Sequence, residues 1–371
     1  MTLGIFRTER EALIALAHVT EPGDPRVGAL VDRWGAQALT DRLATGDIGP
    51  REQAAMRARL ARVDVSEALD SAHAIGARII ERTDREWPTQ LEDLGPAQPL
   101  ALWALGAANL RLTALRSIAV VGARASTAYG DSICRDWCST LAEHSFTVVS
   151  GGAYGIDASA HRAALSAGGM TICVLASGVD IPYPRAHDAL IARIADDGLV
   201  ISESPLGQEV RRQRFLTRNR LIAALTRATL VVEAAVRSGT TSTANAAMAL
   251  NRPVLAVPGP VTSVMSGGCH KLVRETDAIL ASRVEDVLEV IGELGEFSAP
   301  EPERRSLDDL SPIQARILDG IPARGSLAID ALVLDSGLTA SEVSGALGIL
   351  AIRGFVEESA GGWQLVRNAQ R

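Results

Sequence analysis

Two glycine-rich turns followed by a dense run of arginines are the residues of this chain best suited to chemistry. The first turn, GARAST at residues 122–127, follows an apolar run, and the second is SGGAYGID at residues 150–157. Residues 211–220 then hold five arginines together with Phe215. Backbone amides at glycine turns and guanidinium groups both bind phosphate, and bases stack on aromatic rings and guanidinium planes. These residues predict a polyphosphate ligand, and nucleic acid in particular.

A third turn of the same kind occupies residues 233–243, where an apolar run ends at Glu233 and a helix is expected to begin near Thr240. Its hydroxyls and glycine suit a phosphate. We expect residues 203–216 to form a long functional loop that carries Phe215, and a helix to begin at Arg218. The predicted DNA- or phosphate-binding residues are Arg124, Ser126, Gly151, Gly152, Gly155, Arg214, Phe215, Arg218, Asn219, Arg220, Ser238, Gly239 and Thr240. Asp157 is expected to cap the helix that follows the second turn.

The elements that must position these residues alternate along the chain. The apolar runs expected to be strands are 117–121, 146–150, 170–175, 198–202, 228–233 and 253–257, with helical stretches between them and a further strand at 100–106. Alternation of this kind predicts an α/β fold with a doubly wound, mostly parallel sheet that helices cover on both faces. Ligands of such sheets bind where strands end and helices begin, which is where all three turns lie.

The chain is long enough for two or three domains. We expect a helical, SAM-like N-terminal domain at 1–80, with helices within 11–18, 26–34 and 51–69. The core follows at 81–292, a linker rich in proline and glutamate at 293–310, and a winged-helix domain at 311–371, because three short helices precede a hairpin there. The third of these helices, 339–353, is not basic, which favours a protein contact over DNA reading.

Composition narrows the function further. The 371 residues carry a net charge of -7, so a nucleic-acid site must be a local patch. The four cysteines form no Cys-x-x-Cys pair, and no apolar run is long enough for a signal peptide or a membrane span, which predicts a cytoplasmic protein. We expect no cofactor, since Gly-x-Gly-x-x-Gly is missing, and no metal, since Cys269-His270 has no partner pair. We expect no catalytic residues, and His161 to pack rather than react.

Four ordered segments resemble the DprA/Smf family of DNA-processing proteins over roughly residues 85–285. They are AVVGAR at 119–124, VSGGAYGIDASAH at 149–161, FLTRNRLIA at 215–223 and AVPG at 256–259. The helical N-terminal part and the winged-helix tail fit the order of domains in this family.

The resemblance implies a Rossmann-like core that binds single-stranded DNA, delivers it to RecA and protects incoming DNA in natural transformation. It also implies a homodimer formed through the core, and no catalytic activity. The phosphate-binding arginine of the family matches Arg124, its glycine turn matches residues 151–155, and its Phe and Arg-Asn-Arg residues match positions within 215–220. Tyr154 departs from the arginine that is frequent in the family, which removes a cationic contact or replaces it with a stacking surface.

Two other classes of function remain open. A similar core occurs in the Lonely Guy nucleotide phosphoribohydrolases, whose signature is Pro-Gly-Gly-x-Gly-Thr-x-x-Glu. The nearest match here, at 235–243, has Thr243 in place of the glutamate, which removes the carboxylate such cleavage would use. The third class is a nucleotide-sensing scaffold that binds no strand. Binding of a labelled oligonucleotide, compared with release of base from a nucleoside monophosphate, separates the three.

Overall fold

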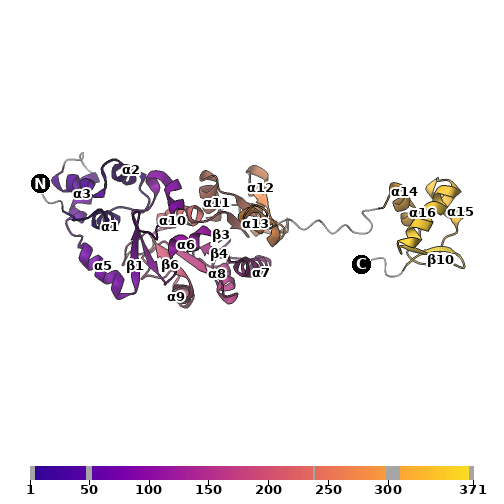
Figure 1. Cartoon of the computed structure of the whole chain (residues 1–371), viewed down its shortest axis with the longest axis horizontal. Helices are drawn as coiled ribbons and strands as arrows, with labels where there is room; N and C mark the ends of the chain where they lie inside the picture. The colour runs from indigo at the N-terminus through magenta and orange to yellow at the C-terminus, as the bar shows by residue number, and fades with distance from the viewer. Residues whose placement is uncertain (1–4, 47–51, 237–238, 298–309, 367–371) are drawn as a thin grey trace. The chain divides into compact units, whose positions relative to one another are not determined.

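A computed structural model describes residues 5–46, 52–236, 239–297 and 310–366 (Figure 1). The chain divides into two compact units, Met1–Ser298 and Ala299–Arg371.

The first unit is built on a sheet of nine strands in the order β1-β2-β6-β5-β4-β3-β7-β8-β9. Strands β1 and β2 are antiparallel to their neighbours, and all pairs from β6 to β9 are parallel. The strands are β1 Ala77–Glu81, β2 Ala101–Leu105, β3 Ser117–Val121, β4 Thr147–Ser150, β5 Thr171–Leu175, β6 Leu199–Ser202, β7 Thr229–Val231, β8 Val254–Ala256 and β9 Ile279–Leu280. The mostly parallel sheet predicted from the alternating apolar runs is therefore confirmed, and every expected run contains a strand.

The order of the strands contains a reversal. From β3 the chain adds β4, β5 and β6 in one direction, and it then returns to place β7 on the other side of β3. In open parallel sheets, ligands bind in the crevice outside the carboxyl ends of the strands at such a reversal. The ends of β3 and β7, which carry the first and third turns, meet at this place.

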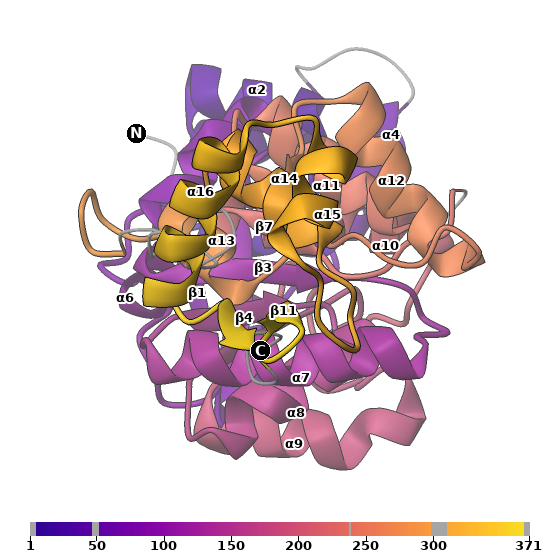
Figure 2. The same cartoon turned by 90° about the vertical axis from the view of Figure 1, so that its right-hand side faces the viewer.

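Helices cover both faces of the sheet. Figure 2 shows α7 and α8 on one side of strands β3 and β7, with α11 and α12 on the other side. On the first face, α7 (Ala128–Glu143), α8 (Ile156–Ser166) and α13 (Val284–Ile291) bury side chains such as Trp137. The second face is covered by α10 Arg212–Leu225, α11 Thr240–Ala249, α12 Gly267–Glu275 and the 3-10 helix Thr89–Ala97. The remaining elements are α6 Leu110–Leu115, α9 Asp188–Asp197 and the 3-10 turns Arg185–His187 and Val264–Ser266.

The N-terminal helices lie at the β1 end of the sheet (Figure 1). They are α1 Glu9–Val19, α2 Pro25–Trp34, α3 Ala36–Thr45, α4 Glu52–Leu60 and α5 Val65–Ala74. Their buried side chains belong to the same apolar cluster as Trp103 of β2. The single helix expected over 51–69 is wrong, because Asp64 accepts hydrogen bonds from the amides of Ser66 and Glu67 and starts α5 there. Helix α3 was not anticipated, and the domain boundaries remain predictions from the sequence.

Helix α10 differs most from expectation. It begins at Arg212, so the connection after β6 is shorter than predicted, and Phe215 and Arg218 are helical. The buried positions of this helix include Arg214, Arg218, Leu221, Ile222 and Leu225. Arginines occupy the first two buried positions and residues 221–225 are all buried, so this helix shows no simple apolar stripe that a search of the sequence could find.

The second unit contains α14 Pro312–Gly320, α15 Ile329–Ser336, α16 Ala340–Ile352, β10 Val356–Ser359 and β11 Gly362–Leu365. Ile317, Leu332, Leu347 and Leu350 form a core of its own. Three helices followed by an antiparallel hairpin confirm the predicted winged-helix order. In the described part of the chain, no helix is both long and apolar enough to span a membrane.

Candidate nucleic-acid interface

A cavity of about 400 Å³ lies at the carboxyl ends of β3 and β7, where the strand order reverses. All three turns contribute to its wall, and so does α10. The lining residues are Val121, Gly122, Ala123, Arg124, Ala125, Ala153, Asp157, Phe215, Arg218, Asn219, Ile222, Ala235, Gly239, Thr240, Thr243 and Met265. The structure thus brings together six of the predicted binding residues: Arg124, Phe215, Arg218, Asn219, Gly239 and Thr240.

Arg218 is the most unusual residue of this cavity. Its side chain is only 7% exposed, and its Nε and Nη1 have no hydrogen-bond partner among the described residues. Burial lowers the pKa of this guanidinium, and the nearby Asp157 carboxyl opposes that effect. A buried donor left unsatisfied costs about 1–3 kcal/mol, so native proteins rarely keep one without a purpose. Arg218 also lines the cavity, so its positive charge can attract an anion that binds there.

The glycine turn after β4 makes room for Arg218. A Cβ atom placed on Gly151 would lie 1.4 Å from the Nη1 of Arg218, so no larger residue fits while the guanidinium stays where it is. Gly155 has φ +72 and lies so close to the Ala123 carbonyl that a Cβ would come within 2.2 Å of that oxygen. Neither these two glycines nor Gly152 lines the cavity, so they act as spacers for it.

The buried carboxylate of Asp157 stabilises this turn through hydrogen bonds. Its Oδ2 accepts hydrogen bonds from the amides of Gly151 (3.2 Å) and Ala153 (3.4 Å). The helix cap expected at Asp157 is wrong, because Gly155 occupies the N-cap position of α8. Burial raises the pKa of Asp157, while the charge of Arg218 and the two amides lower it. These two amides already have an acceptor, so phosphate binding falls to other groups of the cavity.

The N-termini of α7 and α11 differ in whether a carboxylate already occupies them. The amide and hydroxyl of Thr127, at the start of α7, both donate to the buried carboxylate of Glu233. Helix α11 begins at Thr240 after Gly239, with no side-chain cap, and both residues line the cavity. The hydroxyl of Thr240 donates to the Gly122 carbonyl at 3.0 Å. The N-terminus of α11 therefore contributes positive partial charge to the cavity, whereas that of α7 is already neutralised by Glu233.

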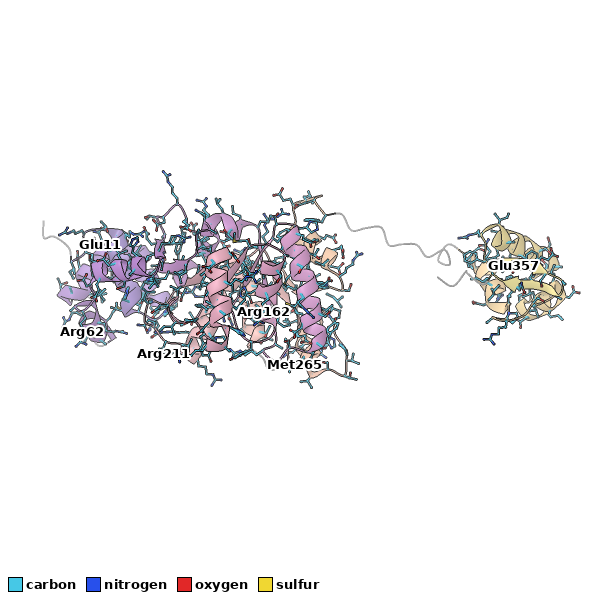
Figure 3. All side chains as sticks on the ribbon, turned by 90° about the horizontal axis from the view of Figure 1, so that it is seen from below. Glu11, Arg62, Arg162, Arg211, Met265 and Glu357 are labelled. Carbon is cyan, nitrogen blue, oxygen red and sulfur yellow. The ribbon has the colours of Figure 1, made fainter. Side chains whose placement is uncertain are left out.

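An exposed row of side chains lies at the mouth of the cavity. The guanidinium carbon of Arg124 lies 5.5 Å from the centroid of the Phe215 ring, and the ring of Tyr183 lies 5.4 Å from Phe215. Arg124 is exposed and Tyr183 keeps 41% of its surface exposed. Tyr183 was missed, since a single tyrosine between two elements carries no pattern. Figure 3 shows Met265, of the cavity wall, and Arg211 along the same margin of this unit.

Arg214 and Arg220 of α10 do not line the cavity. The Nε and Nη2 of Arg214 donate to Glu21 at 3.0 and 3.2 Å, and its Nη1 donates to Gln208. Arg220 pairs with Glu203 at 2.5 Å. Arg220, which the sequence predicted to bind phosphate, therefore does not line the cavity. It lies two positions beyond Arg218, which places it about 200° further around the helix.

The two predicted serines are not part of the cavity wall. Ser126 donates a hydrogen bond to Asp131 at 2.8 Å, which ties it to the first turn of α7. Ser238 lies outside the described residues. His161 is fully buried and bonds to the Thr171 hydroxyl, as expected for a packing residue. In the described part of the chain, no three potential metal ligands of the His, Cys, Asp and Glu types gather.

Two family models and a curated relative match the chain. The family model for DNA recombination-mediator protein A matches residues 78–292, and that for the DprA winged helix domain matches residues 301–362. The chain is 44% identical over 367 residues to a DNA processing protein DprA of Mycobacterium tuberculosis, covering 95% of this chain and 93% of the relative.

Two solved structures are also similar. The X-ray structure of DprA from Streptococcus pneumoniae superimposes with a TM-score of 0.65 at 31% identity, over 79% of this chain and 99% of the other. A DprA structure from Helicobacter pylori, described for its single-stranded DNA binding mode, gives a TM-score of 0.54 at 26% identity, over 61% of this chain and 99% of the other.

Proposed function

The chain belongs to the DprA/Smf family of DNA-processing proteins, and we propose that it binds single-stranded DNA in the cavity at the ends of β3 and β7. The observation that carries the proposal is Arg218, a buried guanidinium with two nitrogens lacking partners in the described residues, on the wall of an open cavity. The H. pylori relative, described as binding single-stranded DNA, supports it. In this proposal the bound strand is delivered to RecA during natural transformation or related recombination.

In this proposal, some residues of the cavity bind the phosphates of the strand and another stacks on its bases. Arg218 and Arg124 bind phosphate oxygens, together with the N-terminus of α11 at Gly239 and Thr240. Phe215 offers its ring to a base, since every base has a face that can stack on it. Phosphate contacts carry no sequence information, so we expect the affinity to depend strongly on salt and weakly on sequence.

A nucleotide-cleaving enzyme is less well supported by the same cavity. Thr243, at the position where the Lonely Guy signature has glutamate, lines the cavity and is 2% exposed. Asp157 supplies the one carboxylate of the described cavity wall, and two amides occupy its Oδ2. A general acid or base must be free to exchange a proton with the substrate. We therefore propose a binding protein without a catalytic step.

The same proposal includes a homodimer formed through the core and a cytoplasmic location. The four cysteines are free and buried, as is usual in a reducing compartment. Size-exclusion chromatography with light scattering tests the dimer. A strand-transfer assay with purified RecA, in which this protein must speed the coating of the strand, tests delivery.

The decisive experiment is fluorescence anisotropy with a labelled thymidine oligonucleotide and a duplex of equal length, at several salt concentrations. We expect the single strand to bind more tightly. Arg124→Ala should weaken binding of every sequence alike and reduce the slope of log K against log salt by about one unit. Equal affinity for strand and duplex, or release of base from nucleoside monophosphates, would contradict the proposal.

The winged-helix unit is not required in this proposal. It has its own core, and the described part of α16 carries no basic residue that could neutralise phosphates. A chain that ends after Ser298 should fold and keep its affinity for single strands to within about tenfold, or ~1.4 kcal/mol. A larger loss, with the core folded and its oligomeric state unchanged, would show that this unit contacts the strand.

A further inference from the structure

The chain has only three tyrosines, and all three expose a large part of their side chains: Tyr129 39%, Tyr154 49% and Tyr183 41%. Tyr129 has a structural role, because its hydroxyl donates to the Pro258 carbonyl at 2.6 Å. In the described part of the chain, the hydroxyls of Tyr154 and Tyr183 have no such partner. Their exposed rings can therefore offer an aromatic face to a ligand.

The segment 183–187, which follows β5, contains Tyr183 and contacts Tyr154 through His187. Tyr183 packs against Phe215, with an angle of 55° between the rings, and Tyr154 meets the edge of His187 at 4.9 Å. His187 is itself buried, and its Nδ1 lies 3.0 Å from the Gly152 carbonyl. Each tyrosine therefore packs on another ring and keeps 41–49% of its surface exposed. We call these two residues the aromatic ledge.

The ledge continues the candidate site. Phe215, which supports Tyr183, lines the cavity, and Ala153, next to Tyr154, lines it too. Arg124 also packs on Phe215, with its guanidinium carbon 5.5 Å from the centroid of that ring. A strand whose phosphate is held by Arg218 and Arg124 would thus pass the ledge as it leaves the cavity.

We infer that the aromatic ledge is a second subsite, which stacks unpaired bases beside the phosphate-binding cavity. The inference rests on the proposed function. Aromatic rings beside a cationic groove bind bases regardless of sequence, because every base has a π-face. Bases within a duplex are already stacked on each other and offer no face to the tyrosines. The ledge would therefore add to the preference for single strands, which the phosphate contacts alone do not provide.

The test compares two labelled oligonucleotides of equal length and charge: one of thymidines, and one whose sugars carry no bases. Tyr183→Ala and Tyr154→Ala should each bind the thymidine strand about five-fold or more weakly. Both should bind the strand without bases as the unaltered protein does, and with the same dependence on salt. Tyr183→Phe and Tyr154→Phe keep the ring and should keep the affinity. Tyr129→Ala, the matched exposed tyrosine away from the ledge, should bind both strands normally.

Three results would separate the possible failures. If the unaltered protein binds no thymidine strand, the proposed function itself fails. If it binds, and Arg218→Ala weakens binding while both tyrosine-to-alanine variants bind normally, only the ledge is refuted. If the alanine variants lose affinity equally for strands with and without bases, the loss comes from a distorted phosphate site, and stacking is refuted as well.

Discussion

Replacing Arg218 with methionine should separate stability from binding in this protein. Methionine has a similar length and no polar hydrogen, so it fills the space beneath Gly151 without a buried charge. The variant loses the donor that we assign to phosphate, and a hydrogen bond to a charged group contributes about 1.5–3 kcal/mol. We therefore expect thymidine oligonucleotides to bind at least about tenfold more weakly.

The stability of the fold should move in the opposite direction. Two nitrogens of Arg218 lack partners among the described residues, and each buried unsatisfied donor costs about 1–3 kcal/mol. The loss of the favourable interaction with Asp157 offsets part of this gain, but Asp157 keeps its hydrogen bonds from two backbone amides. Removal of one partner of a buried ion pair usually destabilises a protein by about 3–5 kcal/mol. Here two unsatisfied donors are removed as well, so we expect the free energy of unfolding to stay unchanged or to rise by roughly 1–3 kcal/mol.

The gain should be larger at acidic pH. Burial already raises the pKa of Asp157 in the folded state, and the charge of Arg218 restrains that rise. Without Arg218 the folded-state pKa increases further above the unfolded value, so the folded protein binds this proton more tightly than the unfolded chain does. This contribution to stability is present at low pH and is lost as pH rises through the folded pKa.

Urea denaturation of the variant and the parent at two pH values measures these free energies. Arg214→Met is the matched control, since Arg214 lies one turn earlier on α10 and is equally buried, at 7% exposure. Its guanidinium is paired with Glu21 and Gln208, so we expect that control to lose about 2 kcal/mol or more. If Arg218→Met is destabilised as much as Arg214→Met, Arg218 is a structural residue and the reasoning fails.

Three further predictions concern the surroundings of Arg218. Gly151→Ala should displace the guanidinium and weaken strand binding about tenfold or more, and it should add little in an Arg218→Ala background; a double-mutant cycle measures this coupling. Burial lowers the pKa of His161 to about 3, so the unfolded chain takes up a proton that the folded chain refuses, and stability should fall as pH drops below about 6.5. His161→Gln should flatten this decline in urea titrations between neutral and mildly acidic pH. Glu203→Gln should lower the affinity for the strand although it removes a negative charge, because Arg220 loses the partner that anchors α10; a gain of affinity in anisotropy would refute this.

The sheet and the position of the cavity were accessible from the sequence for a simple reason. Parallel strands buried on both faces are continuous apolar runs, and their carboxyl ends must lie on one edge of the sheet. Turns at 122–127, 150–157 and 233–243 follow three such runs, so their convergence is a consequence of topology. The carboxylates that occupy parts of these turns were harder to foresee. Glu233 accepts a hydrogen bond from the amide of Thr127, which is 106 residues away in the sequence, and no local pattern predicts such a contact.

The burial of the arginines in residues 211–220 could not be predicted from the sequence either. Charged residues are usually exposed, so residues 211–220 suggested a loop followed by the start of a helix. In the structure, Arg214 and Arg218 occupy buried positions of α10 that apolar residues would normally fill. One is balanced by Glu21 from the α1–α2 connection, and the other meets the cavity. Only the three-dimensional positions of partners far away in sequence distinguish these two environments.

Three arginines of α10 differ in their contacts. Arg218 lines the cavity, whereas Arg214 and Arg220 each pair with a glutamate, although the Nε and Nη1 of Arg220 also lack hydrogen-bond partners among the described residues. Arg214 forms an ion pair with Glu21, and Arg220 forms one with Glu203. Glu203 also accepts a hydrogen bond from the amide of Gly23. These contacts hold the helix from the side of the N-terminal helices, so Arg218 cannot swing away to find water. A guanidinium held in place in this way loses little further conformational freedom when a phosphate arrives, and preorganisation of this kind increases affinity by reducing the cost of ordering. The stability lost by burying Arg218 is, in this view, recovered when the strand binds.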